Sequence, residues 1–342
     1  MKVACRFFLI LALLLTPLTA QATSQPAPKA ADLVTDGQAI DLTSERYRGL
    51  FKELRQSHGF SQEELDKIFA GASIRRRVLE LMDTQWEAKP YFEYYPRFIT
   101  WPTIGNGRSL LAKHKELLDR VEAEFGVERE IVVAIWGIES RFGSNDGSFN
   151  MFQTLNTMFD AYPRRSSFYR QQLVEFLLLC RENNVDPLNV SGSYGGAFGQ
   201  TQFIPSSFRA YAVDFDGDGR RDVWNSVPDV LASIANYLKQ FGWKFGAPIY
   251  RELGRELKDK ELTAAFEAGR QGLLKREKVA AALGIELPPA QDNKPLTIVG
   301  LELEGGGMRY VAGYPNFQAI TKWNNSNRYA MAVTELAEKF RE

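Results

Sequence analysis

Residues 127–143 read VEREIVVAIWGIESRFG, and this stretch sets the expected fold around it. Ile131, Ile135 and Ile138 recur at the spacing of one helix face, which predicts a buried helix. Glu139 lies four residues after Ile135 and so continues the same apolar stripe. Burial favours the protonated form of a carboxyl group, and a protonated carboxyl group can donate a proton. The glycine that closes the stretch is expected to follow the helix end, so that Glu139 faces a cleft.

Glu139 has a second interpretation, as a structural residue that pairs with Arg141 or another cation at the helix end. Charged side chains are seldom buried without a partner, and a carboxyl group with a shifted titration is typical of an active site. The sequence therefore favours Glu139 as a catalytic acid and leaves the structural pairing as the alternative.

A second stretch, residues 193–205, reads SYGGAFGQTQFIP and is rich in glycine. Glycine lets a backbone approach a ligand closely, and Ser193 and Gln202 offer neutral hydrogen bonds. The stretch has neither the nucleophile elbow of a serine hydrolase nor a phosphate-binding Walker motif. A tight structural turn is the alternative, so the loop alone is weak evidence for a binding site.

Residues 214–222 read DFDGDGRRD and match the start of an EF-hand calcium loop. Oxygen ligands fall at the first, third and fifth loop positions, a glycine makes the turn, and the next carbonyl can point inward. Asn225 stands where the closing glutamate is usual, and a further aspartate follows shortly after it. The predicted ligands are Asp214, Asp216, Asp218, the Arg220 carbonyl and Asp229. A structural Ca²⁺ is expected, with a solvated acidic turn or a calcium sensor as the alternatives.

The N-terminal residues are typical of an exported protein. Basic residues begin the chain, an apolar run follows at 7–15, and Ala20-Gln21-Ala22 forms a small-residue cleavage site. Residues 1–22 are therefore predicted to be a signal peptide cleaved near Ala22, which implies a periplasmic protein, with an uncleaved anchor as the alternative. Cys5 precedes the apolar run, so no lipoprotein tether is expected.

Composition excludes several function classes. The 342 residues carry 42 basic and 42 acidic side chains, so the net charge is zero and a nucleic-acid partner is not expected. His58 and His114 are too far apart in the sequence for a HExxH zinc site, and no organic cofactor is expected. Beyond the signal peptide, no segment of the sequence is long and apolar enough to span a membrane.

Most of the remaining chain has a helical pattern. Ser61 and Glu64 form a predicted capping box, and the aromatic stretch at 86–101 is either plain core or a wall on which sugars stack. Residues 296–303 and 308–311, joined by three glycines, predict a β-hairpin. The pattern therefore indicates a mainly α protein with one small insertion that contains β-structure.

The helix with Glu139, the glycine-rich loop and the acidic loop, in this order, resemble the lytic murein transglycosylase B family from about residue 40 to the C-terminus. The resemblance implies a mainly α (α+β) fold, a lysozyme-like core with an additional helical domain and a small β-hairpin-containing insertion. It also implies an enzyme that cleaves the bond between N-acetylmuramic acid and N-acetylglucosamine in peptidoglycan without water, leaving 1,6-anhydromuramoyl ends. A hydrolytic muramidase with a second carboxylate, or a non-catalytic peptidoglycan-binding scaffold, is the alternative.

The resemblance also assigns residues. It makes Glu139 the single acid and base, and its substrate-binding positions correspond to Tyr94, Arg164, Arg165, Ser193, Gln202, Trp323, Asn324 and Tyr329. The family usually has tyrosine where this chain has Trp323, so the expected role of Trp323 is stacking. Arg164 and Arg165 are expected to meet carboxylates of the substrate, and a solvated charge run is the alternative.

The expected division of the chain follows from the same resemblance. It comprises a signal peptide at 1–22, a flexible leader at 23–40, an N-terminal helical domain at 41–114, a catalytic core with the acidic loop at 115–243, a small α/β insertion at 244–315 and a C-terminal helical segment at 316–342 that completes the groove. The expected partners are peptidoglycan glycan strands and enzymes of cell-wall synthesis, and the protein is expected to be a monomer.

Overall fold

The computed structural model describes residues 29–83 and 89–342. The predicted signal peptide at 1–22, the predicted leader up to residue 28 and Trp86 of the aromatic stretch lie outside these ranges. No helix of the described part is long and apolar enough to cross a membrane.

The fold is mainly helical, as predicted. The α-helices are α1 (Glu45–His58), α2 (Gln62–Phe69), α3 (Arg76–Met82), α4 (Tyr91–Tyr94), α5 (Trp101–Lys113), α6 (Lys115–Phe125), α7 (Arg129–Ser140), α8 (Met151–Ala161), α9 (Ser166–Glu182), α10 (Pro205–Tyr211), α11 (Val227–Gln240), α12 (Lys260–Glu267), α13 (Arg276–Leu283), α14 (Pro315–Trp323) and α15 (Asn327–Arg341). The predicted capping box begins α2, where the Ser61 hydroxyl accepts from the Glu64 N–H and the Glu64 carboxylate accepts from the Ser61 N–H.

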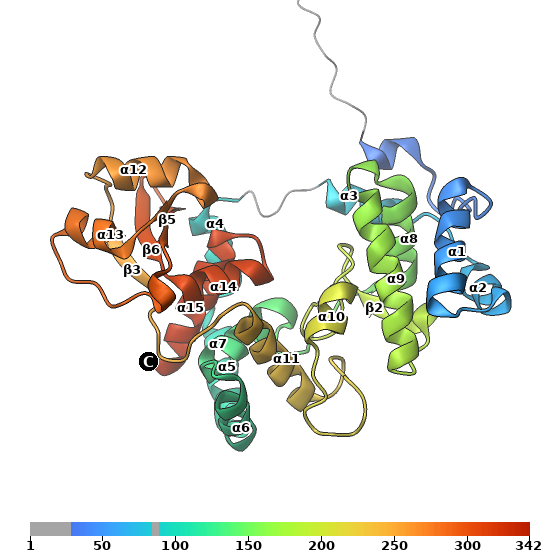
Figure 1. The fold of residues 1–342 in the computed structure, drawn as a ribbon, viewed down its shortest axis with the longest axis horizontal. Coiled ribbons are helices and arrows are strands. Elements are labelled where there is room, and N and C mark those ends of the chain that lie inside the picture. Colours follow the sequence, from blue (N-terminus) through green and yellow to red (C-terminus); the bar gives the residue numbers. More distant parts are fainter. Residues whose placement is uncertain (1–28, 84–88) are drawn as a thin grey trace, which may run out of the picture.

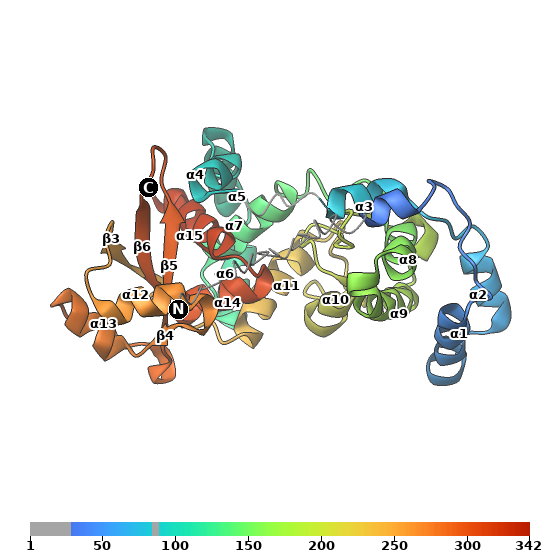
Figure 2. The same cartoon turned by 90° about the horizontal axis from the view of Figure 1, so that it is seen from above.

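The helices form two groups along the long axis of the molecule (Figures 1 and 2). In one group, α1, α2 and α3 lie beside α8 and α9, and the Tyr47 hydroxyl of α1 donates to Asn156 of α8 at 3.1 Å. In the other, α5, α6, α7 and α11 lie beside α14 and α15, and Arg108 of α5 donates to the Lys339 carbonyl at 2.6 Å. Residues 41–114, grouped as one helical unit from the sequence, therefore contribute to both groups.

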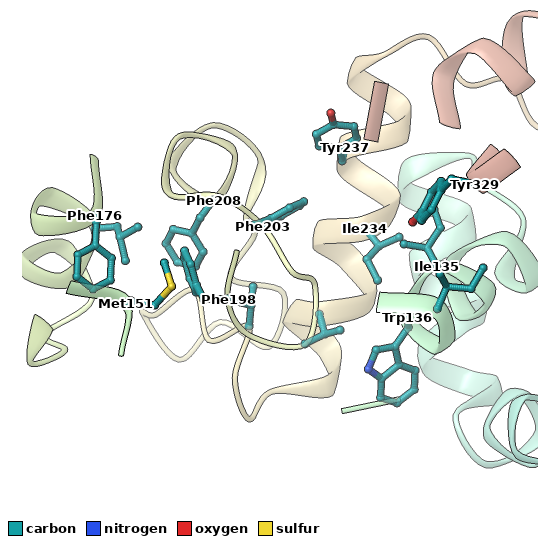
Figure 3. Close-up of a cluster of buried hydrophobic side chains, with 14 of the residues drawn as sticks. Ile135, Trp136, Met151, Phe176, Phe198, Phe203, Phe208, Ile234, Tyr237 and Tyr329 are labelled. Carbon is teal, nitrogen blue, oxygen red and sulfur yellow. The ribbon is translucent and has the colours of Figure 1, made fainter. Parts of the chain in front are cut away.

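A line of buried apolar side chains joins the two groups (Figure 3). It runs from Phe176 of α9 through Phe198 and Phe208 to Ile234 of α11 and Ile135 of α7. Cys180 of α9 is a free cysteine with 1% exposure. The loops between α9 and α11 are thus packed from both sides, which fixes their position relative to α7.

The strands form two antiparallel sheets. They are β1 (Phe149–Asn150), β2 (Ser191–Gly192), β3 (Tyr250–Gly254), β4 (Leu273–Leu274), β5 (Leu296–Glu302) and β6 (Met308–Gly313), paired as β1-β2 and β3-β6-β5-β4. The predicted hairpin is β5 and β6, with Val299 opposite Val311. Leu301 belongs to the main core and Ile298 to a second cluster on the other face, so β5 is buried on both faces.

Candidate active site and metal loop

Glu139 lies in the last turn of α7, where the helix meets a strained turn. The residues before it are buried, as predicted, and Glu139 itself is half-buried. Arg141 and Phe142 follow in the left-handed region, with φ of 51° and 58°. Such a backbone is costly for residues other than glycine and is frequent beside functional sites. The helix therefore ends at Ser140 and presents the Glu139 carboxylate at its tip.

Two neutral donors contact the same oxygen of Glu139. The indole N–H of Trp323 donates to Oε1 at 2.8 Å, and the hydroxyl of Tyr329 donates to Oε1 at 2.6 Å. Trp323 ends α14 and Tyr329 lies in the first turn of α15, so the C-terminal helices supply both donors. Arg141, the partner considered from the sequence, is exposed.

Tyr329 is a permanent donor at this position. It is 2% exposed, and burial, together with the nearby charge of Glu139, raises its pKa well above the ordinary value. Tyr94 is near enough to Tyr329 to contribute to the same shift. The phenol of Tyr329 therefore keeps its proton in the pH range where proteins are folded.

Trp323 does more than stack. Its ring packs against Phe203 and Tyr237, with centroids 5.0 Å and 4.7 Å away, and the Tyr237 hydroxyl donates to the Lys322 carbonyl at 2.6 Å. These contacts fix the indole so that its N–H reaches Glu139. The sequence analysis expected only stacking because the family usually has tyrosine at this position, and the indole N–H adds a hydrogen bond to Glu139.

The glycine-rich loop holds Ser193 and Gln202 in turns. The Ser193 Oγ accepts from the Ala197 N–H at 3.1 Å, and the Gln202 amide nitrogen donates to the Asp146 and Gly199 carbonyls at 3.0 Å and 2.9 Å. Both amide hydrogens of Gln202 are therefore used, which leaves its oxygen for an incoming donor. Phe203, the next residue, packs on Trp323, so the loop and Glu139 share a wall.

Gln200 is a functional candidate that the sequence analysis missed. Its side-chain oxygen accepts from the Trp136 indole of α7 at 2.9 Å, and its nitrogen donates to the Trp224 carbonyl at 2.7 Å. Gly143 makes this approach possible, because a Cβ there would lie 2.3 Å from the Gln200 Oε1. Gln200 thus ties the helix of Glu139 to the segment that follows the acidic loop. A polar residue directly after Gly199, at the end of the glycine-rich run, is the signal that could have found it.

A cavity of about 700 Å³ opens beside the tip of α7. Phe98 and Arg97 line it from the aromatic stretch, and Ile138, Arg141 and Phe142 line it from the end of α7. The aromatic stretch is therefore of mixed character, because Tyr91 is 4% exposed and belongs to the core. The cavity thus combines apolar and cationic groups at the end of α7, and Glu139 is not one of the residues that line it.

The two predicted arginines lie in a 3₁₀-helix, Pro163–Arg165, with different surroundings. Arg164 donates to the Asp83 carboxylate at 2.9 Å and so already has a carboxylate partner. The guanidinium of Arg165 lies 4.3 Å from the Phe168 ring centroid and is exposed. Asn324, another predicted residue, is half-buried and caps the end of α14 directly after Trp323. Asn324 is thus adjacent to the Glu139 donors, whereas Arg165 is the better placed of the two arginines for a further anion.

Three predicted metal ligands come together at the start of α11. Oxygens of Asp214, Asp216 and Asp229 lie within 4.8 Å of one another. Asp218 is not part of this group, and its carboxylate accepts from the Arg220 N–H at 2.8 Å. Asp229 is fully buried, and mainly for that reason its pKa is raised. Three carboxylates in such proximity could bind a metal ion, with oxygen donors that suit Ca²⁺.

Comparisons with known proteins agree with this geometry. The family model described as "Transglycosylase SLT domain" matches residues 43–338. "Membrane-bound lytic murein transglycosylase B" of Escherichia coli (strain K12) is 34% identical over 291 residues, covering 82% of this chain and 78% of that protein.

Solved structures are similar over most of the chain. The E. coli lytic transglycosylase Slt35 in complex with calcium has a TM-score of 0.78 and 32% identity, covering 91% of this chain and 96% of that one. SltB3 from Pseudomonas aeruginosa in complex with NAG-NAM-pentapeptide has a TM-score of 0.74 and 33% identity, covering 87% of this chain and 79% of that one. The fold around Glu139 is thus shared with proteins crystallised with calcium and with a peptidoglycan fragment.

Proposed function

The chain belongs to the lytic murein transglycosylase B family and is an enzyme that acts on peptidoglycan, and from that premise we propose its reaction. It cleaves the β-1,4 bond between N-acetylmuramic acid and N-acetylglucosamine without water and leaves 1,6-anhydromuramoyl ends. The observation that carries this proposal is the Glu139 carboxylate at the tip of α7, held through Oε1 by Trp323 and Tyr329.

Glu139 acts first as an acid. Its proton moves to the glycosidic oxygen while the bond from that oxygen to the muramoyl anomeric carbon breaks, so positive charge develops on the sugar. Because Oε1 already accepts two hydrogen bonds, the proton that Glu139 donates lies on Oε2. The donors on Oε1 then stabilise the carboxylate that remains.

Glu139 next acts as a base. The carboxylate removes the proton from the C6 hydroxyl of the same sugar, and that oxygen bonds to the anomeric carbon. The substrate's own acetamido group can stabilise the charge in between. An internal nucleophile of this kind has an effective concentration on the order of 10⁵ M or more, which lets it compete with water.

The remaining substrate contacts are proposed from the positions around Glu139. The proposed sugar-binding side chains are Tyr94, Arg164, Arg165, Ser193, Gln202, Trp323, Asn324 and Tyr329. Trp323 contributes chiefly by holding Glu139, and Gln202 offers its amide oxygen to a sugar hydroxyl. Arg165 is the arginine proposed to meet a substrate carboxylate, because Arg164 is paired with Asp83.

The acidic loop fits a structural Ca²⁺. Asp214, Asp216 and Asp229 supply the oxygen donors, and the Arg220 carbonyl and Asp218 are the further proposed ligands. A related enzyme, Slt35, was crystallised with calcium. The ion would hold the loop against α11, which carries Tyr237 and thereby the indole of Trp323. Its chemistry is charge compensation, and the bond cleavage uses the residues of the chain.

The proposed location is the periplasm, where the polymer lies, with export through the signal peptide at 1–22. The proposed partners are glycan strands and enzymes of cell-wall synthesis, and the proposed state is a monomer. Related SltB3 binds a peptidoglycan fragment, which supports the first of these partners.

Glu139→Gln tests the proposal. The amide cannot supply the proton, so cleavage of purified glycan should fall by a factor of about 10² to 10⁴ or more, while glycan binding persists. Binding is measured by co-sedimentation with sacculi, and cleavage by mass spectrometry of released fragments. Turnover within tenfold of the wild type would remove Glu139 from its role. Loss of cleavage in Glu139→Gln also separates the enzyme from a non-catalytic scaffold.

A further inference from the structure

Helix α1 carries three cations along one exposed face, far from Glu139. Arg48, Lys52 and Arg55 follow one another at spacings of four and three residues, which places them on the same side of the helix. Within residues 29–83 and 89–342, none of the three forms an ion pair. Like charges at these spacings repel one another along a helix, and the carboxylate of Asp41 is near enough to Arg48 to interact with it electrostatically. The face nevertheless carries three cations without a direct ion pair in the described residues.

The cations border a cavity between α1 and the start of α2. It has a volume of about 580 Å³ and is lined by Arg48, Lys52 and Arg55 together with Phe51 and Phe60. A second cavity of about 420 Å³ shares Arg48 and Phe51 with the first and continues it along α2. We call the combined feature the α1–α2 groove.

The floor of the α1–α2 groove is apolar, and its rim is cationic. Phe60 and Phe69 are 5% and 1% exposed, whereas Arg48, Lys52 and Arg55 are exposed. Arg55 donates to the side chain of Gln62 at 3.0 Å, which joins the two helices across the groove. Asp66 lines the far end of the second cavity, beyond the cations. The chemistry suits a ligand that has carboxylates along one edge and small alkyl groups along the other.

Helices α1 and α2, which form the α1–α2 groove, lie at one end of the long axis, well away from α7 (Figures 1 and 2). A ligand bound there is not the sugar being cleaved at Glu139. The concave shape does not suit a flat lipid surface, and none of the large apolar side chains exposed in the described part belongs to α1 or α2.

The dimensions fit a short extended peptide. From Arg48 to Arg55 the helix rises by about 10 Å, and an extended peptide of three residues covers roughly the same length. Two carboxylates separated by that distance can thus meet the two ends of the cationic face. Arginine binds carboxylates through paired N–H groups, and the half-buried side chains of Leu42 and Phe51 offer apolar contact to alkyl groups.

We propose that the α1–α2 groove binds the peptide stems of peptidoglycan through their carboxylates. This inference rests on the proposed function, because its substrate is a polymer that carries such stems. Docking on a stem of a neighbouring strand would keep the enzyme on the polymer between cuts and raise the local concentration of glycan at Glu139.

The test measures binding of a free murein tetrapeptide stem to the full mature protein by titration calorimetry. The variants are the triple Arg48→Ala/Lys52→Ala/Arg55→Ala and the control Lys67→Ala, an exposed cation of α2 that lines neither cavity. The triple variant should bind at least tenfold more weakly than the wild type, and the control should bind within twofold. Binding to the wild type should also weaken as salt is raised. Thermal melting of each variant confirms that it is folded.

Three further ligands test whether the groove recognises the stem itself or any negatively charged molecule. A stem with amidated carboxylates and an unrelated acidic peptide of equal charge should both bind at least tenfold more weakly than the native stem, and vesicles of anionic phospholipid should not bind. Equal affinity of wild type and triple variant for the stem would overturn the inference, as would equal binding of the unrelated peptide or binding of the vesicles alone. Cleavage of peptide-free glycan by the wild type is assayed separately. If that cleavage is present and stem binding is absent, the docking inference fails and the proposed function stands.

Discussion

The indole N–H of Trp323 lies 2.8 Å from Oε1 of Glu139, although 184 residues separate the two in the chain. The contact brings the end of α14 to the tip of α7, where the indole packs against the rings of Phe203 and Tyr237. Because an indole N–H can only donate, it stabilises the carboxylate and never takes the catalytic proton. The two helices thus form one acid–base unit.

Trp323→Phe should lower kcat by about tenfold to a hundredfold, with a smaller change in KM. The ring remains, but one hydrogen bond to a charged group is lost, and such a bond contributes about 1.5–3 kcal/mol. Trp323→Tyr should recover part of the lost rate, because a phenol again supplies a donor. Steady-state kinetics on peptide-free glycan provides the measurement. A full rate in Trp323→Phe would show that the indole serves only to stack.

Tyr329→Phe should lower kcat. Burial raises the pKa of Tyr329 well above its ordinary value, so the phenol stays protonated and keeps donating from about pH 5 to pH 9. Because this hydrogen bond stabilises the Glu139 carboxylate, its removal should move the limb that Glu139 controls to higher pH without adding or removing a limb. A profile for Tyr329→Phe that gains or loses an alkaline limb would contradict this role.

Gln200→Leu should destabilise the protein by about 2–4 kcal/mol, since the Trp136 indole and the Trp224 carbonyl each lose a partner in a buried setting. Leucine and glutamine have nearly the same side-chain volume, so the change in the free energy of unfolding reports the loss of the hydrogen bonds. Urea denaturation gives the free energy of unfolding. Gln240→Leu, at an exposed position of α11, is the control and should change it by a few tenths of a kcal/mol. Similar values for the two variants would remove Gln200 from its positioning role.

Calcium should stabilise the fold through the acidic loop. At free Ca²⁺ of about 100 times the dissociation constant, linkage gives roughly 2.7 kcal/mol, and Asp216→Ala should lose most of this gain. Melting is compared with Ca²⁺ and with chelator for both proteins. The same response to chelator in wild type and Asp216→Ala would place the ion elsewhere.

The stabilisation of the fold by calcium should also increase as pH rises. The pKa of Asp229 is raised by burial, so in chelator the stability it contributes is present at low pH and is lost as pH rises through that raised pKa. Calcium replaces the proton and removes this penalty. The difference in melting temperature between calcium and chelator should therefore be larger at pH 7 than near the ordinary pKa of an aspartate, at about pH 4. A difference that is constant or falls with pH would argue against Asp229 as a ligand.

Local patterns predicted the elements whose signals are contained in a few neighbouring residues. The capping box at Ser61, the hairpin of β5 and β6 and the apolar stripe of α7 are of this kind. The strand β3 was missed, because its half-exposed residues carry charges that also suit a helix. The second core behind Ile298 was missed as well, since only the tertiary structure covers that face.

The residues of the candidate site also fall into those that the sequence predicts and those that only the structure shows. Spacing was enough to single out Glu139 and the acidic loop, and the resemblance added the positions near them. The donor role of Trp323, the bridge at Gln200 and the pairing of Arg164 with Asp83 depend on contacts between distant segments. No periodicity encodes such contacts, so they appear only once the helices are packed.

The central claim is that a sugar hydroxyl, and not water, closes on the anomeric carbon, and the rival hydrolase would need a second carboxylate. Gln202 donates to the backbone carbonyl of Asp146 at 3.0 Å, which makes Asp146 an acidic residue of the neighbouring segment, and Asp146→Asn removes its carboxylate. The direct measurement is digestion of purified sacculi in water enriched in ¹⁸O, followed by mass spectrometry of the new muramoyl ends. The account predicts anhydro ends without heavy oxygen, for the wild type and for Asp146→Asn. Heavy oxygen at the anomeric position in the wild-type digest would show a hydrolase and contradict it, whatever Asp146→Asn does.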